Sequence, residues 1–250
     1  MISRQKIKYI KSLQLKKYQK QEQKFLVEGE KSVLEVLHSP YKINILLATK
    51  RFLDANQLKI NKKDIEVLEV AERELERTGS LKTNNAAIAV VEMPAEQLYD
   101  EGKVKLLPVF DGLQDPGNLG TIIRTCDWYG LDTIILSLNS VDVYNPKVIQ
   151  ASMGSFVRVN VFYRDLQSFL DQSRIPIYGT VLEGDNLYHI SWPEQAIVVF
   201  GNESQGISAD LGKYFSRRIS IPRFGKAESL NVGIATAVVV DNILRSEKGS

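Results

Sequence analysis

Continuous apolar runs alternate with segments of helical periodicity over the second half of the chain. The runs predict strands at residues 104–110, 133–138, 157–162, 175–180, 196–200 and 218–221, and the periodic segments predict helices at 119–130, 146–152, 165–173, 208–215 and 230–246. Strands without polar alternation are typical of sheets buried on both faces, and the helices supply the crossovers that parallel strands need. We therefore predict an α/β domain with a mostly parallel sheet covered by helices.

The first part of the chain repeats this alternation on a smaller scale. We expect helices at 31–38, 51–58 and 71–77 and strands at 43–48, 65–70 and 86–91, with Pro40 and Gly79 stopping two of the helices. Residues 94–105 then break the apolar pattern, although 96–99 has the spacing of one helical turn. The predicted organisation is a basic helical arm at 1–24, a small α/β domain at 25–94, a linker at 95–104 and a larger α/β domain at 105–250.

Charge is distributed unevenly between these parts. The whole chain has 32 basic and 30 acidic side chains, a net charge of +2. Residues 1–24 hold eight of the basic ones and a single acidic one, Glu22, so their net charge is +7 and that of the remainder is −5. The eight are Arg4, Lys6, Lys8, Lys11, Lys16, Lys17, Lys20 and Lys24. Ser3 is a candidate cap, and Ile7, Ile10 and either Leu13 or Gln14 lie near one face. The charge pattern favours equally an RNA-facing helix and a solvated surface helix.

Composition narrows the class of protein further. The hydrophobic content of 44% indicates a folded globular chain, and a lone cysteine, Cys126, excludes an internal disulfide and a cysteine-cluster metal site. No apolar run reaches the ~18 residues of a membrane helix. The N-terminus lacks the apolar segment of a secretory signal, and one Arg with two Ser disfavours the alternative of a mitochondrial presequence. We expect a cytoplasmic protein with no membrane partner.

Three loops that follow predicted strands share a composition rich in glycine and short polar side chains. They cover residues 111–120, 201–206 and 222–231, and each leads into a predicted helix. Glycine permits close backbone approach to a ligand, and a helix start offers free N–H donors. One such loop is ordinary turn chemistry, with Asn118 and Ser208 as caps. Three at the carboxyl edge of one parallel sheet predict a ligand-binding site.

Several common sites are missing from these loops. A G-x-G-x-x-G fingerprint, a P-loop, a zinc-deaminase H-x-E with paired cysteines and a G-x-S-x-G elbow are all absent. Both histidines, His38 and His189, lie outside the loops. This argues against a nucleotide-dependent oxidoreductase, a P-loop NTPase, a zinc deaminase and a serine hydrolase. We expect Cys126 to be a core residue.

Three motifs in the loops carry a resemblance to a known family. In chain order they are Asn118-x-Gly120-x-x-x-Arg124, Gly201-Asn202-Glu203-x-x-Gly206, and Ile221-Pro222 with Ser229-Leu230-Asn231-Val232. They resemble the three motifs of the SpoU/TrmH family of RNA ribose 2′-O-methyltransferases, within the SPOUT class. Their order and spacing match, over roughly 105–245. The run Phe25-Leu26-Val27-Glu28-Gly29 and the pattern after it look like the L30e-like substrate-binding domain that many members carry.

The resemblance implies a fold and a cofactor. The fold is a SPOUT-type sheet with a C-terminal trefoil knot, and members are homodimers that pack their motif regions and last helix together. The knot loops hold S-adenosylmethionine largely through backbone groups. The implied cofactor-binding residues are Thr180, Leu182, Gly201, Asn202, Gly206, Ile221, Ser229 and Leu230. Arg223 departs from the apolar residue that many members have and is a candidate phosphate contact.

The resemblance also implies a reaction, methyl transfer to a ribose 2′-oxygen without a metal. The implied catalytic residues are Arg124, Asn118, Glu203, Ser229 and Asn231. A guanidinium is almost always protonated, so we favour Arg124 as a cation that positions the hydroxyl and lowers its pKa over a neutral arginine base. We expect Asn118 to fix Arg124 or the ribose-phosphate, and Glu203 to orient its motif or brace its loop.

The N-terminal domain favours 23S ribosomal RNA as the substrate, because structured RNA is recognised by shape and unstacked loops. The alternatives are transfer RNA and a catalytically silent RNA-binding protein.

Overall fold

The computed structural model describes residues 2–95, 99–100, 105–202 and 204–248. The helical turn expected at 96–99 falls largely outside them. The chain forms two compact units, one of residues 1–97 with 143–157 and one of residues 98–142 with 158–250. Residues 143–157, which lie within the larger domain expected from the sequence, therefore pack with the smaller unit.

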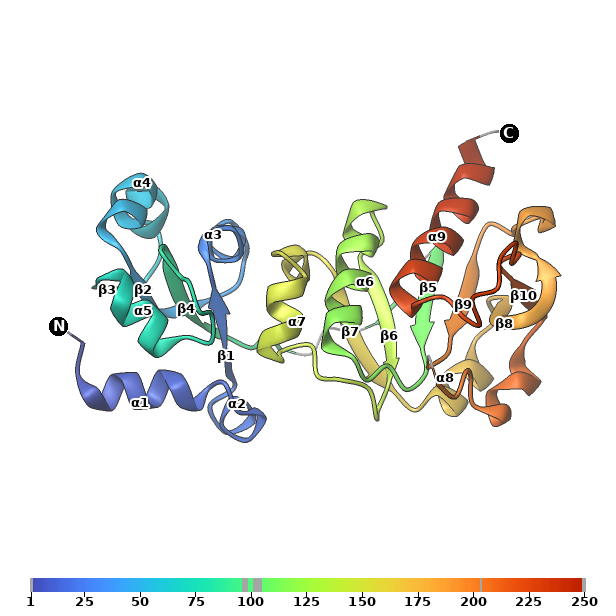
Figure 1. The fold of residues 1–250 in the computed structure, drawn as a ribbon, viewed down its shortest axis with the longest axis horizontal. Helices are drawn as coiled ribbons and strands as arrows, with labels where there is room; N and C mark the ends of the chain where they lie inside the picture. The colour runs from blue at the N-terminus through green and yellow to red at the C-terminus, as the bar shows by residue number, and fades with distance from the viewer. Residues whose placement is uncertain (1, 96–98, 101–104, 203, 249–250) are drawn as a thin grey trace. The chain divides into compact units, whose positions relative to one another are not determined.

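The first unit is built on a four-stranded sheet with the order β1-β4-β2-β3 (Figure 1). The strands are β1 (Lys24–Glu28), β2 (Ile43–Ala48), β3 (Glu66–Glu69) and β4 (Ala87–Glu92). Strand β4 pairs antiparallel with β1 and β2, while β2 and β3 are parallel. The helices of this unit are α1 (Arg4–Ser12), α2 (Lys16–Glu22), α3 (Glu30–His38), α4 (Lys50–Ile60), α5 (Glu72–Thr78) and α7 (Pro146–Ala151).

The basic N-terminal segment is part of this unit's core. Its two helices begin after Ser3, whose side chain accepts a hydrogen bond from the Lys6 N–H and so forms the expected cap. Ile10 and Leu13 are fully buried and pack in one cluster with strand and helix residues of the unit, Leu47 among them. The exposed lysines of α1 and α2 therefore project from an anchored helix pair.

The second unit contains a six-stranded sheet in which every neighbouring pair is parallel, with the order β10-β8-β9-β5-β6-β7. The strands are β5 (Leu106–Phe110), β6 (Thr133–Ser137), β7 (Asn160–Arg164), β8 (Ile177–Asn186), β9 (Ala196–Phe200) and β10 (Arg217–Ser220). All residues of β5, β6 and β9 are buried. The parallel sheet predicted from the apolar runs is thus confirmed.

Helices cover both faces of the second sheet. Helix α8 (Leu166–Gln172) and the 3-10 helix at Ala209–Tyr214 bury Leu166, Leu170 and Leu211 against the core of one face. Helices α6 (Pro116–Trp128) and α9 (Val232–Lys248) lie side by side on the other (Figure 1). A short 3-10 turn at Leu187–His189 follows β8. Over the described parts of the chain, no helix has the length and apolarity of a membrane span.

Several boundaries differ from those expected. Helix α6 begins at Pro116, not at 119, because Asp115 is its cap and proline suits the first helical position, which leaves Asn118 inside the first turn. Strand β7 begins at Asn160, not at 157, because 155–157 form a 3-10 turn. The segment expected as a helix at 208–215 is also 3-10, and Ser208 makes no side-chain cap bond there. Strand β1 was not among the expected strands.

Candidate active site

The carboxyl ends of the parallel strands bring the three glycine-rich loops to one edge of the second sheet. A fourth segment joins them from β8. Its ladder with β10 pairs Gly179 with Arg218 and then Asp185 with Ile219, so residues 180–184 stand between the two runs of pairs. The strand expected to end at Thr180 therefore continues to Asn186 with a bulge at 180–184, and this bulge lies at the edge where ligands bind in such sheets.

Asp111, which follows β5 directly, ties the first loop to the second. Its N–H donates to the Phe200 carbonyl (2.9 Å), and its Oδ2 accepts from the Ser208 N–H (2.8 Å). The Asn202 Nδ2 donates to the Gly112 carbonyl at 2.8 Å. Asp111 had no predicted role, because an aspartate after a strand is common turn chemistry; its position after a fully buried strand is the available signal.

The second loop is a tight turn that depends on glycine. Asn202 and Gly206 exchange backbone hydrogen bonds of 3.0 and 2.8 Å, and Gly206 has a φ of +69°. A Cβ on Gly201 would lie 2.3 Å from the Gly206 carbonyl carbon and 2.4 Å from the Ile207 nitrogen. Because these backbone atoms lie so close, residue 201 has room only for glycine. Glu203 lies outside the described residues.

A side-chain hydrogen bond joins the first and third motifs. The Asn231 Nδ2 donates to the Asn118 Oδ1 at 2.8 Å. The Asn231 Oδ1 also accepts from the Gly233 and Ile234 N–H groups, at 2.9 and 3.3 Å, and thereby caps α9. Asn118 thus contacts Asn231 of the third motif, and its expected role toward Arg124 or the ribose-phosphate stays a prediction.

Arg124 projects from α6 near the start of α9. Thr121, three residues earlier and on a neighbouring position of the helix face, lies 3.4 Å from the point where a Gly233 Cβ would stand. Arg124 is exposed and, among the residues that the structure describes, makes no hydrogen bond or ion pair. Its five N–H donors are therefore available to a ligand phosphate or ribose.

The expected cofactor residues present apolar side chains and free backbone groups. Leu182 is 76% exposed and Leu230 is 47% exposed. The Thr180 Oγ1 donates to the Val199 carbonyl at 3.0 Å, so this hydroxyl braces the sheet edge. Ile221 is half-buried and Ser229 is exposed. Within the described chain, the N–H groups of residues 223–230 have no hydrogen-bond partner. Such a set fits a ligand with an apolar ring and polar groups read by the backbone.

Cys126 lies in α6, the helix that also carries Arg124. The thiol is buried in α6, and burial, with the charge of Asp127, raises its pKa to about 12. It stays protonated at neutral pH and is a core residue as expected. The described residues contain no group of three or more His, Cys, Asp or Glu side chains placed to hold a metal ion.

The parallel sheet and the hydrogen bonds among its three motif loops agree with the arrangement that the family resemblance implies. The chain belongs to the SpoU rRNA Methylase family, which its residues 105–241 match. Residues 4–89 match the MRM3-like substrate binding domain.

Individual relatives match nearly the whole chain. The 23S rRNA (guanosine(2553)-2′-O)-methyltransferase RlmP of Bacillus subtilis is 34% identical over 240 residues, which cover 94% of each protein. A TrmH-family protein from Porphyromonas gingivalis is 37% identical, with a TM-score of 0.84 over 97% of this chain and 98% of that chain. An AdoMet-bound rRNA methyltransferase from Sinorhizobium meliloti is 26% identical, with a TM-score of 0.87 over 98% of this chain and 96% of that chain.

Proposed function

We propose that this protein transfers a methyl group from S-adenosylmethionine to the 2′-oxygen of a ribose in 23S ribosomal RNA, in the cytoplasm. The observation that carries the proposal is the hydrogen bond between Asn118 and Asn231. It joins motifs 113 residues apart at the edge from which Arg124 projects. Family membership and the likeness to a 23S rRNA methyltransferase over 94% of the chain support the substrate class.

The cofactor supplies an activated methyl group on a sulfonium, and sulfur loses its positive charge when that methyl group leaves. The chain's residues must prepare the acceptor, because a ribose hydroxyl is a poor nucleophile until its proton is removed or shared. Arg124 places a cation beside the hydroxyl, which stabilises the developing alkoxide, and the proton that the hydroxyl loses as the oxygen–methyl bond forms passes to solvent water. Asn118 and Asn231 fix the start of α9 against α6, and Ser229 is a further contact to ribose or phosphate.

Backbone recognition of S-adenosylmethionine is consistent with the loops. Leu182 and Leu230 offer apolar surface to an adenine ring, and the unpaired N–H groups of 223–230 offer donors. Gly201, Asn202 and Gly206 shape the neighbouring turn. The trefoil knot that the family resemblance implies belongs to the same proposal.

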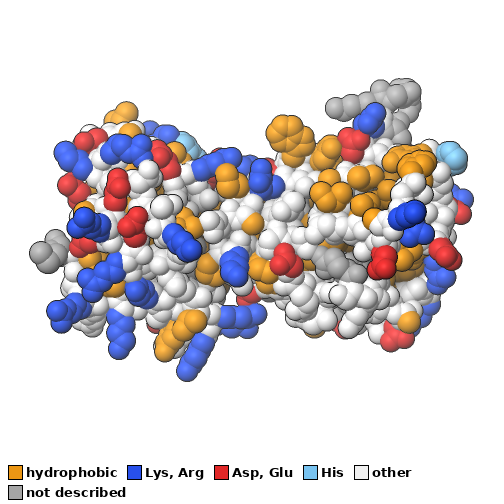
Figure 2. Space-filling model, viewed as in Figure 1, with side chains coloured by type: hydrophobic (Ala, Val, Ile, Leu, Met, Phe, Trp, Pro, Cys, Tyr) orange, Lys and Arg blue, Asp and Glu red, His pale blue; other side chains and the backbone are white. Residues whose placement is uncertain are grey.

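The first unit is suited to hold the RNA. Two exposed apolar side chains, Leu15 and Tyr18, stand in the same segment as the exposed lysines of α1 and α2. These lysines are Lys8, Lys11, Lys16, Lys17 and Lys20. Figure 2 shows Lys and Arg side chains spread over this unit. Their contacts to phosphates would release counterions, so affinity for RNA should fall with salt.

A homodimer that packs on α9 is part of the proposal. Ile234 is 53% exposed, and a cavity of about 650 Å³ lies beside the helix. It is lined by Tyr188, Ala237, Val238, Asp241, Asn242 and Arg245. Figure 2 shows hydrophobic side chains gathered on this part of the second unit. Sedimentation velocity tests this part, since a monomer at micromolar concentration would contradict it.

The experiment that tests the function compares ribose methylation in total RNA from a strain with the gene and a strain without it. We expect at least one 2′-O-methyl group of 23S rRNA to disappear with the gene. Loss of 2′-O-methyl groups from transfer RNA alone would identify transfer RNA as the substrate in place of 23S rRNA. Unchanged methylation together with no heat on titration with S-adenosylmethionine would favour a silent RNA-binding protein.

A further inference from the structure

Phe224 has the largest exposed fraction, 93%, among the large hydrophobic side chains of the described chain. Single exposed hydrophobic residues are common on protein surfaces, so the exposure alone decides nothing. The position of Phe224 is what distinguishes it. It lies in the segment 221–231 between β10 and α9, which ends at Asn231 and is fixed there to Asn118 of α6. The ring therefore stands on a loop that is anchored in the candidate active site.

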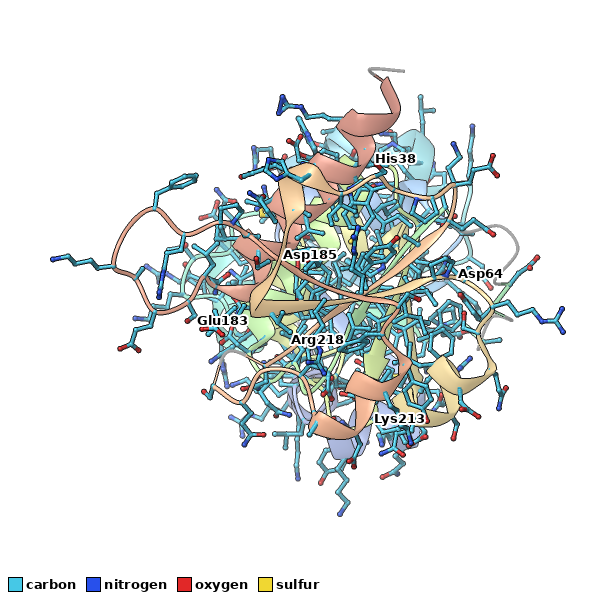
Figure 3. All side chains as sticks on the ribbon, turned by 90° about the vertical axis from the view of Figure 1, so that its right-hand side faces the viewer. His38, Asp64, Glu183, Asp185, Lys213 and Arg218 are labelled. Atoms are coloured by element: carbon cyan, nitrogen blue, oxygen red, sulfur yellow. The ribbon has the colours of Figure 1, made fainter. Side chains whose placement is uncertain are left out.

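The loop presents the ring to solvent. The Arg223 Nη1 donates to the Ala227 carbonyl at 3.3 Å, and this bond closes the tip around residues 224–226. A Cβ added to Gly225 would meet nothing within 4 Å, so the tip is surrounded by open space. Figure 3 shows the segment that leads into α9 projecting outward from the body of the unit, with its side chains pointing away.

Charged neighbours indicate what kind of partner would cover the ring. Arg223 and Lys226 flank Phe224, both are exposed, and Glu228 is the acidic residue of the segment. Cations beside an aromatic face are typical of sites for unpaired nucleotides, because every base has a face to stack and a phosphate to neutralise. Cores of protein interfaces are instead depleted of lysine, whereas the tip of this loop carries its one aromatic ring between Arg223 and Lys226.

We propose that Phe224 stacks on an unpaired base of the RNA next to the methylated nucleotide, while Lys226 contacts a neighbouring phosphate. Phe224 is then a specificity-determining residue whose side chain positions the RNA over Arg124, while the cofactor is bound through backbone groups of the same loop. The inference rests on the proposed function in one respect, that the substrate is RNA.

The test uses the full-length protein and ribosomal RNA extracted from a strain that lacks the gene. Filter binding gives the Kd for this RNA, and methyl incorporation gives KM and kcat. Phe224→Leu keeps apolar bulk but removes the aromatic face, and Phe224→Trp keeps that face. We expect Phe224→Leu to raise the Kd and KM by about 5- to 100-fold and Phe224→Trp to stay within about twofold of wild type. Lys226→Gln should make the salt slope of binding shallower by about 0.7–0.9.

Other results would overturn the inference. Equal Kd values for wild type and Phe224→Leu would do so, as would a tryptophan variant as weak as the leucine variant. A changed sedimentation coefficient for Phe224→Leu would assign the ring to a second copy of the chain, and a changed affinity for S-adenosylmethionine would assign it to the cofactor. Because binding is measured without turnover, a wild type that binds this RNA but does not methylate it would contradict the proposed function and leave the binding comparison valid.

Discussion

Replacing Gly201 with alanine should damage the fold and the cofactor site together. The new Cβ would stand 2.3 Å from the Gly206 carbonyl carbon, whereas ordinary contacts begin at 3.4 Å. The two backbone segments would have to separate by about 1 Å, and neither contact is the flexible end of a side chain. Overpacking of this kind costs about 1–3 kcal/mol. For a protein of this size that corresponds to a fall in Tm of about 2–12 °C.

Differential scanning calorimetry and isothermal titration with S-adenosylmethionine measure the two effects. Gly225→Ala is the matched control for the calorimetry alone, because its Cβ meets nothing within 4 Å, whereas its loop belongs to the proposed cofactor site. The control should stay within about 0.5 kcal/mol of wild type. If Gly201→Ala unfolds at the wild-type temperature and binds the cofactor as tightly as wild type does, the backbone of Gly206 does not lie as close to residue 201 as the structure has it.

Three further predictions concern separate parts of the molecule. A double-mutant cycle of Asn118→Ala and Asn231→Ala should give a coupling free energy of about 0.5–1.5 kcal/mol in thermal unfolding, and strict additivity would argue against their hydrogen bond. Burial that raises the pKa of Cys126 to about 12 should slow its alkylation at pH 8 by about three orders of magnitude relative to the unfolded chain. The same burial stabilises the fold below the unfolded pKa of ~8.5, and this contribution declines as the pH rises toward 12. Alkylation of the native protein at the rate of the unfolded chain would contradict the burial of Cys126. Changing Lys16, Lys17 and Lys20 together to glutamine should reduce the salt slope of RNA binding by about 2–3 with unchanged cofactor affinity, and an unchanged slope would make α2 an ordinary solvated helix.

The structure also decides how the basic segment is best tested. Deleting residues 1–20 would remove Ile10 and Leu13, both fully buried, and would therefore expose the core of the first unit. Substituting the exposed lysines removes charge without that loss of packing. The positive charge and the helical spacing were visible in the sequence, whereas the anchoring of the segment depends on contacts with residues such as Leu47, which no local pattern shows.

The larger sheet was the part of the fold most accessible to sequence reasoning. Its central strands are buried at every position, so their apolar runs were continuous and easily separated from helices. Boundaries were lost where local chemistry competed with periodicity. Asp115 and Pro116 start α6 earlier than its first apolar residue does, and the 3-10 turn at 155–157 occupies apolar residues that a strand would also accept.

The candidate site was predictable in its place and less so in its connections. Parallel strands direct their following loops to one edge, which placed Gly201 and Ile221 correctly at that edge. The pairing of Asn118 with Asn231 spans 113 residues, and only the family resemblance brought the two motifs together. Phe224 had no predicted role, because an aromatic residue in a loop is distinguished only by its exposure, which the sequence pattern does not show.

The central claim is that Arg124 acts on the RNA hydroxyl and not on the cofactor. The direct measurement is single-turnover methyl transfer to ribosomal RNA from the deletion strain, together with the Kd for S-adenosylmethionine, for wild type and Arg124→Ala. Loss of a transition-state cation typically costs about a hundredfold or more in rate. We predict that methyl transfer by Arg124→Ala falls by at least that factor while the cofactor Kd stays within about twofold. Transfer at the wild-type rate, or a loss explained by weaker cofactor binding, would contradict the account.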